Sequence, residues 1–204
     1  MADHNDTIRL QSFLSVFRPR ALAQGITSGT FDRCLKGVKP LPDVLKRMDA
    51  QAEFTLSLRD YMDRVATSKR VTDGRTELRK RRPLFMRIEA EFGVEAEPVL
   101  AIWGVETNFG RQRGKVPTLA ALATLAASGR RRAAFFESEL LAALNLVQSG
   151  QVTPKLMLGS WAGAMGHGQF MPSSVLAYAV DHDGDGRADI WHKDPEDGLA
   201  SIAN

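Results

Sequence analysis

The sequence predicts a mainly α-helical fold, and three observations support that class. Apolar residues recur at helical spacing through most of the 204 residues. No segment alternates polar and apolar residues over more than about four positions, as a half-buried strand would. The composition is 44% hydrophobic and 25% charged, which is typical of a globular chain that buries its own core.

The first third of the chain predicts two helices. An amphipathic stretch favours a helix over residues 8–19 or slightly beyond. Residues 25–30 have the composition of a turn, and Pro-Leu-Pro at 40–42 breaks the chain. Asp43 can cap a second helix, which we expect to run to about residue 66. Its apolar positions are Leu45, Met48, Phe54, Leu58, Tyr61, Met62 and Val65.

The middle of the chain predicts two more helices. A break is expected at residues 72–74, because Asp-Gly favours a turn. The next helix carries apolar residues from Leu78 onward, opens with the basic run Arg79–Arg82 and stops at Gly93. Pro98 then begins a short, strongly apolar helix.

The last part of the chain predicts three helices around a glycine-rich segment. Residues 118–127 and 131–147 have helical patterns, and Ser128-Gly129 separates them. Four glycines then fall within residues 159–168. Pro172 begins a helix that we expect to extend through Val180.

Cysteine content and hydropathy exclude several classes of protein. A single cysteine, Cys34, rules out a disulfide within the chain and any zinc site built on cysteines. The longest nearly apolar stretch, Val99–Val105, is far shorter than the roughly 20 residues that a membrane-spanning helix needs. No basic-then-apolar segment typical of a secretory signal opens the chain.

Charge is distributed unevenly over a chain whose formal net charge is +3. Residues 1–100 hold 18 Lys/Arg and 14 Asp/Glu, whereas residues 101–204 hold 9 and 10. Residues 181–197 alone hold seven acids and two bases. The remaining basic surface favours a polyanionic partner. The basic runs 79–82 and 130–132 lack a recognition motif, so we expect solvated helix faces and no nucleic-acid partner.

Glu106 is the first candidate for chemistry. It is the only ionisable residue between Glu97 and Arg111, and it lies in the last turn of the predicted helix that begins at Pro98. Apolar neighbours would desolvate its carboxyl group, and the negative end of the helix also favours the protonated form. Both effects suit a general acid, although a glutamate whose carboxyl group reaches solvent is the simpler alternative.

The glycine-rich segment is a second candidate. Ser160 and Gln169 could donate hydrogen bonds to a ligand, while Trp161 and Phe170 offer flat apolar faces for a sugar ring. The alternative is a tight crossing of the chain, where glycine relieves crowding. His167 has no second His or Cys at ligand spacing, so we expect a cleft or surface histidine and no metal ligand.

The acidic segment 181–197 predicts a calcium loop. Asp181, Asp183 and Asp185 occupy loop positions 1, 3 and 5, with Gly186 at position 6. Arg187 would donate its backbone carbonyl at position 7. Position 12 is His192, which cannot replace the usual bidentate glutamate, so a lengthened loop must be closed by another acid. The candidates for that acid are Asp189, Asp194, Glu196 and Asp197.

These segments together resemble a known family. The order GVETNFG, Arg131-Arg132 before AAFF, AGAMGHGQFMPSS and DHDGDGRADIW is similar to that of the membrane-bound lytic murein transglycosylase B family. Upstream, Gly25-Ile-Thr, Thr30-Phe-Asp and Ala52-Glu-Phe-Thr fit the same family. The resemblance implies a lysozyme-like helical core at 79–204, with an EF-hand-like calcium loop at 181–197, and an N-terminal helical region at 1–78.

The resemblance also implies an activity. Family members cleave the β-1,4 bond between N-acetylmuramic acid (MurNAc) and N-acetylglucosamine (GlcNAc) of peptidoglycan and leave a 1,6-anhydro sugar. By position in the motif, Glu106 is the single general acid and base. Ser160 and Gln169 would bind substrate beside it, and Met165 and Phe170 would shape the apolar wall. By the same match, Asp197 closes the loop around a structural Ca²⁺.

The resemblance implies a protein of the periplasm or cell envelope, and we expect a monomer whose partners are glycan strands. Family members continue past Asn204 with a helical section, so we expect this chain to be a trimmed or partial copy. Two alternatives remain: a lysozyme-type hydrolase on the same scaffold, and a truncated peptidoglycan-binding module without activity.

Overall fold

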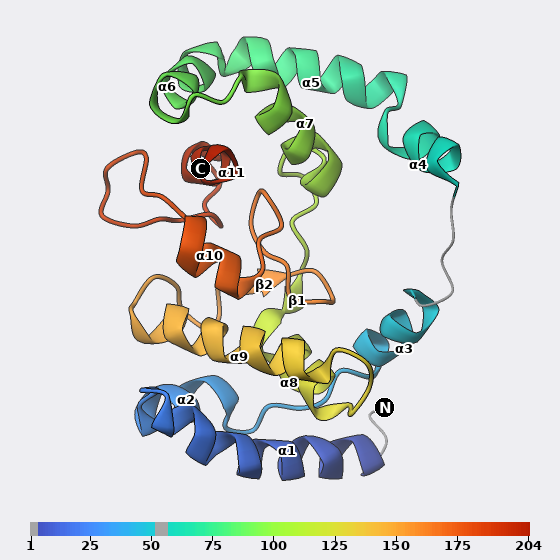
Figure 1. Cartoon of the computed structure of the whole chain (residues 1–204), viewed down its shortest axis with the longest axis vertical. Coiled ribbons are helices and arrows are strands. Elements are labelled where there is room, and N and C mark those ends of the chain that lie inside the picture. Colours follow the sequence, from blue (N-terminus) through green and yellow to red (C-terminus); the bar gives the residue numbers. More distant parts are fainter. Residues whose placement is uncertain (1–3, 52–56) are drawn as a thin grey trace. The chain divides into compact units, whose positions relative to one another are not determined.

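The computed structural model describes residues 4–51 and 57–204 and is mainly helical there (Figure 1). Its helices are α1 (His4–Ala23), α2 (Ser28–Leu35), α3 (Pro42–Gln51), α4 (Leu58–Val65), α5 (Ser68–Lys80), α6 (Arg82–Phe92), α7 (Ala96–Thr107), α8 (Thr118–Ala127), α9 (Ala133–Gln148), α10 (Pro172–Tyr178) and α11 (Glu196–Ala203). Two short strands, β1 (Val116–Pro117) and β2 (Leu158–Gly159), pair antiparallel. Within these described residues no helix is long and apolar enough to cross a membrane.

The chain forms two compact units, each built from separate stretches of sequence. Unit 1 comprises the described residues within 1–52, 114–165 and 170–177, and unit 2 comprises those within 53–113, 166–169 and 178–204. The predicted boundary between residues 78 and 79 stays a prediction.

Unit 1 is organised around α8. Eight of the ten residues of α8 are buried, from Thr118 to Ala126, as expected for a helix that is apolar on all sides. It packs against α9, α1 and α3. Thr124 also donates to the Ala120 carbonyl and accepts a hydrogen bond from the Leu41 backbone N–H, which ties the start of α3 to this core.

Unit 2 has its own core. It is formed by the buried residues of α6, α7 and α11 together with the segment after α7: Leu84, Phe85, Ile88, Val99, Trp103, Phe109, Leu199 and Ala200. Figure 1 shows α11 beside α6 and α7, against which it packs. These contacts fix the helix that carries Glu106.

The predicted stop at Gly93 and the helix over residues 118–127 are confirmed. Gly93 adopts a left-handed conformation with φ of 68° at the end of α6, as a helix-terminating glycine does. The helix predicted to follow Pro172 is also present as α10, two residues shorter than expected.

The predicted break at residues 72–74 is wrong, because α5 runs through it. Gly74 is buried inside that helix, and a Cβ there would lie 3.2 Å from the Phe109 ring. The glycine therefore serves packing and forms no turn. The basic run is also divided, since Arg79 and Lys80 end α5 and α6 begins at Arg82.

Two other predictions near the N-terminus are wrong. Residues 28–30 belong to α2, because the Thr27 hydroxyl caps it by accepting the Thr30 backbone N–H. The single helix predicted over residues 43–66 is divided, since Ser57 is extended and caps α4. Phe54 lies outside the described residues, as does the whole of the Ala52–Thr55 match. Further upstream, α1 continues through Pro19 to Ala23.

Candidate functional site

Glu106 lies near the end of α7, on the side of the helix that faces away from the core of unit 2. Trp103 and Thr107 are buried, whereas Ile102, Val105 and Glu106 are exposed. Among the described residues the Glu106 carboxyl group has no hydrogen-bond or ion-pair partner. Partial desolvation raises its pKa above the usual value, in the direction that the sequence predicted. Glu106 therefore presents a carboxyl group that is unpaired among the described residues and is flanked by apolar side chains.

The end of α7 has an unusual backbone. Asn108, Phe109 and Gly110 follow one another with φ of 50°, 58° and 77°. Left-handed conformations at non-glycine residues cost of the order of 1 kcal/mol each, so surrounding contacts must hold them. The Phe109 ring makes an edge contact with Trp103, with centroids 5.6 Å apart. A Cβ at Gly104 would lie 2.8 Å from that ring, so glycine makes this packing possible.

His167 is buried beneath this turn, so the expectation of a cleft or surface histidine is wrong. The Trp103 indole N–H donates to its Nδ1 at 3.0 Å. Because an indole N–H can only donate, the ring proton must sit on Nε2, which lies 2.9 Å from the carbonyl oxygen of His192. Burial lowers the pKa of His167 to about 4, helped by the nearby Arg113 and Arg81. His167 is therefore a neutral link between α7 and residue 192.

Thr107 and Arg113 complete this support. The Thr107 hydroxyl lies 2.9 Å from the His167 carbonyl oxygen, to which it donates, and it accepts the Gly110 backbone N–H. Arg113 donates to the carbonyl oxygens of Trp191 and His192 at 2.6 and 2.7 Å. Neither role could be predicted from local sequence, since both depend on chain segments more than 50 positions away.

Gln169 belongs to the same unit as Glu106. Its backbone is left-handed, with φ of 52°. Its side-chain amide donates to the carbonyl oxygens of Gly166 and Arg113 at 3.2 and 3.3 Å. These bonds fix the orientation of the side chain and leave its carbonyl oxygen without a partner among the described residues.

Ser160, Met165 and Phe170 belong to unit 1, where the glycine-rich chain folds back on itself. Met165 and Phe170 exchange backbone hydrogen bonds of 2.8 and 2.9 Å. The Ser160 hydroxyl accepts the Ala164 backbone N–H at 3.1 Å. Met165 is fully buried, so it can influence a ligand only through the residues that cover it, while Ser160 and Phe170 are partly exposed.

The alternative interpretation of the glycine-rich segment, that glycine relieves crowding where two stretches of chain cross, is supported within unit 1. A Cβ at Gly159 would lie 2.2 Å from the Ala164 carbonyl oxygen, and one at Gly114 would lie 2.0 Å from the Gly159 carbonyl oxygen. Both positions need glycine because another stretch of backbone occupies the space of a side chain. This does not exclude a ligand, because Ser160 and Trp161 still line a pocket of this unit.

The acidic loop brings three predicted ligands together. Asp181, Asp183 and Asp185 each place an oxygen within 4.8 Å of the others, and all three are exposed. Gly184 and Gly186 have φ of 78° and 91°, which supplies the sharp turn that the sequence predicted. The donor set is entirely oxygen, as a hard cation such as Ca²⁺ prefers.

The Asp197 carboxylate holds the acidic loop by accepting hydrogen bonds from backbone N–H groups of that loop. One carboxylate oxygen accepts the N–H groups of His182 and Asp183 at 2.9 and 3.3 Å, and the other accepts that of Asp189 at 2.8 Å. Burial raises the pKa of Asp197 in spite of these bonds. Asp197 is not in the three-acid cluster, and it lies inside the first turn of α11.

The sequence matches the family described as Transglycosylase SLT domain over residues 9–204. The chain belongs to this family. Membrane-bound lytic murein transglycosylase B of Escherichia coli strain K12 is 39% identical over 180 residues, which are 83% of this chain and 49% of that protein. The chain thus spans about half the length of this curated relative.

Solved structures support the same assignment. SltB3 from Pseudomonas aeruginosa in complex with NAG-NAM-pentapeptide (NAG and NAM denote GlcNAc and MurNAc) is 43% identical with a TM-score of 0.89, covering 96% of this chain and 52% of SltB3. E. coli Slt35 in complex with calcium is 35% identical with a TM-score of 0.80, covering 100% of this chain and 67% of Slt35. The mainly helical, lysozyme-like fold and the lytic murein transglycosylase family, both predicted from the sequence motifs, are therefore confirmed.

Proposed function

We propose that this transglycosylase SLT chain is a lytic transglycosylase of the cell envelope. It cleaves the β-1,4 bond between MurNAc and GlcNAc in peptidoglycan strands that carry stem peptides. The observation that carries the proposal is Glu106, an exposed carboxyl group with a raised pKa that is unpaired among the described residues, in a chain of this family. Relatives solved with NAG-NAM-pentapeptide and with NAG-anhNAM-pentapeptide support the substrate and the product class.

In this reaction Glu106 first acts as the general acid. Its proton passes to the glycosidic oxygen as the bond to C1 of MurNAc breaks, and the GlcNAc unit leaves with a free 4-hydroxyl. The C6 hydroxyl of the same MurNAc attacks C1, and its proton returns to the Glu106 carboxylate. The carboxyl group is regenerated and no water is consumed, so one carboxylate suffices where hydrolases use two.

The contacts beneath α7 explain why this end of the helix is well suited to positioning an acid. Trp103 and Thr107 flank Glu106 within one turn, and both bond to His167. Because His167 is held neutral, it adds no positive charge that would lower the pKa of the acid. Ser160, Gln169 and Phe170 are proposed to bind the glycan, and Met165, buried within unit 1, is proposed to shape the apolar wall through the residues that cover it.

Replacing Glu106 tests the assignment. Glu106→Gln keeps the shape and removes the proton, so we expect loss of at least about a hundredfold in cleavage of purified peptidoglycan. Mass spectrometry of the soluble muropeptides should show anhydro ends, one water lighter than hydrolysis products, only with the wild-type chain.

Glu97→Gln is the matched control, since Glu97 is an exposed glutamate in the first turn of the same helix. It should retain wild-type activity. Hydrated ends would assign the chain to the hydrolases instead. Tight binding to sacculi without soluble product would assign it to the binding modules.

We also propose that the acidic loop binds one structural Ca²⁺. Asp181, Asp183 and Asp185 would supply carboxylate oxygens and Arg187 its backbone carbonyl, with Asp197 as the closing acid. The cluster of three acids supports the site, as does the relative solved in complex with calcium. Bound calcium would offset the mutual repulsion of the acids and stiffen the loop that precedes α11.

Replacing Asp183 tests the calcium site. In wild-type protein, millimolar calcium should raise the midpoint of thermal unfolding by several degrees, because a ligand that binds only the folded state stabilises it. Asp183→Asn should abolish most of that increase while leaving the calcium-free midpoint nearly unchanged. Asp63→Asn, which removes an exposed acid of α4, is the control. Identical melting curves with calcium and with chelator for the wild-type chain would contradict the site.

A further inference from the structure

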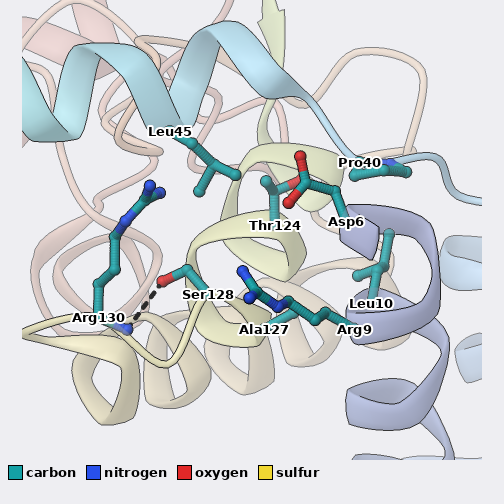
Figure 2. Close-up of a pocket in the computed structure, with 9 residues that line it drawn as sticks. All are labelled: Asp6, Arg9, Leu10, Pro40, Leu45, Thr124, Ala127, Ser128 and Arg130. Carbon is teal, nitrogen blue, oxygen red and sulfur yellow. Dashed lines mark hydrogen bonds between the residues drawn. The ribbon is translucent and has the colours of Figure 1, made fainter. Parts of the chain in front are cut away.

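Unit 1 contains an open pocket lined in part by Ser160, and no step of the proposed bond cleavage takes place in it. Its volume is about 560 Å³, which is within the range of ligand-binding pockets, roughly 300–1,000 Å³. Residues 41–44 and Arg47, segment 114–117 and residues 159–161 line it. A second cavity of the same unit, shown in Figure 2, has only about 10 Å³ and is too small for more than one water molecule.

The walls of the larger pocket combine apolar surface with two cations. Leu41, Pro117 and Trp161 offer apolar faces, and Arg47 and Lys115 are the basic residues. Arg47 comes from α3, whereas Lys115 lies in the segment that leads into β1. The two positive charges therefore come from chain segments that are distant in sequence.

Neither cation is neutralised by the protein. Among the described residues, neither Arg47 nor Lys115 has a hydrogen-bond or ion-pair partner. Among the described residues that line the pocket, the only acid is Asp43, and its carboxylate already lies 3.6 Å from Lys46. A pocket with two free cations and apolar walls favours an anionic ligand that also carries aliphatic groups.

From these features we infer that this pocket binds the carboxylate-bearing stem peptide of the glycan strand. The inference rests on the proposed function, because Ser160 is a proposed glycan-binding residue and also lines the pocket. A stem peptide linked to MurNAc presents free carboxylates and short aliphatic side chains, which match the cations and the apolar walls. Arg47 can bind a carboxylate through two parallel hydrogen bonds, and Lys115 through its point charge.

The test measures binding separately from cleavage. All proteins carry Glu106→Gln so that no ligand is consumed, and isothermal titration compares three probes. These probes are NAG-NAM-pentapeptide, NAG-NAM without peptide, and NAG-NAM-pentapeptide with its carboxyl groups converted to amides. We expect the Glu106→Gln chain to bind the first probe at least about 10-fold more tightly than the other two.

Charge-removing substitutions locate the effect. Arg47→Gln and Lys115→Gln should each weaken binding of NAG-NAM-pentapeptide by about 5-fold, and together by about 20-fold, while binding of NAG-NAM stays unchanged. Lys155→Gln is the matched control, because Lys155 is an exposed lysine of unit 1 outside the pocket lining. All three residues are exposed, so the variants should fold normally, and their unfolding midpoints verify this.

The outcomes separate the two proposals. Equal affinity for the three probes, or unchanged affinity in the Arg47 and Lys115 variants, would contradict binding of the stem peptide in this pocket, even if the chain cleaves peptidoglycan. Discrimination among the probes that these substitutions remove would support the pocket even if the chain with an intact Glu106 released no product.

Discussion

Gly159 in the glycine-rich segment and Gly184 in the acidic loop are required for different physical reasons. In the glycine-rich segment, residues 159–170, Gly159 has an ordinary backbone, and a Cβ would lie 2.2 Å from the Ala164 carbonyl oxygen. In the acidic loop, residues 181–197, Gly184 has φ of 78°, and nothing lies within 4 Å of where a Cβ would be. The first glycine provides space for another stretch of backbone, and the second provides a backbone conformation.

Because of this difference, adding one methyl group at each glycine should lower the free energy of unfolding by different amounts. A clash with backbone atoms cannot be relieved by turning a side chain, so the chain itself must move. A left-handed residue with open space around it costs only its conformational preference, roughly 1–2 kcal/mol. Two predictions test this comparison directly, and a third, for the buried His167 of the glycine-rich segment, falls between them in expected effect.

The largest effect is expected for Gly159→Ala. The new methyl group would separate Gly159 from Ala164 and disturb the β1–β2 pairing, so the free energy of unfolding should fall by about 3 kcal/mol or more. Urea unfolding followed by circular dichroism measures this change. Gly29→Ala, in the first turn of α2 with nothing within 4 Å, should be neutral or slightly stabilising. Equal effects of the two substitutions would contradict the steric role of Gly159.

An intermediate effect is expected from the buried His167, which lies in the glycine-rich segment. Its pKa is about 4 in the folded protein against an ordinary value of 6.5, so below pH 6.5 the unfolded chain binds more protons than the folded one. Its contribution to stability is complete above pH 6.5 and is lost as the pH falls toward 4. Between about pH 7 and pH 5 the free energy of unfolding should fall by about 2 kcal/mol from this group.

His167→Gln isolates this contribution, because glutamine has no proton to gain over that range. The variant should be less stable than wild type at pH 7 and should lose less stability on acidification. His4→Gln, which removes a histidine from the exposed start of α1, should leave the wild-type profile unchanged. Parallel stability profiles for wild type and His167→Gln would show that His167 titrates normally.

The smallest effect is expected for Gly184→Ala in the acidic loop. In calcium-free buffer the free energy of unfolding should fall by about 1 kcal/mol, because alanine tolerates the left-handed conformation poorly. Gly184→Asn should cost less, since asparagine adopts that conformation more readily. A loss for Gly184→Ala as large as that for Gly159→Ala would mean that the open space around Gly184 is filled in solution.

Local sequence was a reliable guide where local forces decide the structure. The end of α6 at Gly93 and the whole of α8 were predictable, because one follows from a helix-terminating glycine and the other from a segment in which eight of ten residues are alanine or leucine. The three acids of the loop converge for the same reason, since glycine at 184 and 186 permits the turn. The family motifs likewise depend on the order of residues along the chain.

Prediction failed where a distant segment supplied the deciding contact. Gly74 was expected to break a helix, yet it lies inside α5. Its missing side chain leaves room there for the Phe109 ring. His167 was expected to be a cleft or surface residue, and instead it is buried by bonds to Trp103 and His192. Neither partner could be inferred, because each lies at least 25 positions away along the chain.

Glu106 shows both contributions at one residue. The sequence by itself placed a carboxyl group near the end of an apolar helix and predicted the direction of its pKa shift, which partial desolvation in the structure bears out. Only the tertiary structure decided which neighbours share its side of that helix. Trp103 and Phe109 turn into the core of unit 2, where they bury their rings, and the carboxyl group is left on the exposed side with Ile102 and Val105. Local sequence fixes the spacing of side chains on a helix, whereas packing against distant segments selects the side that is buried.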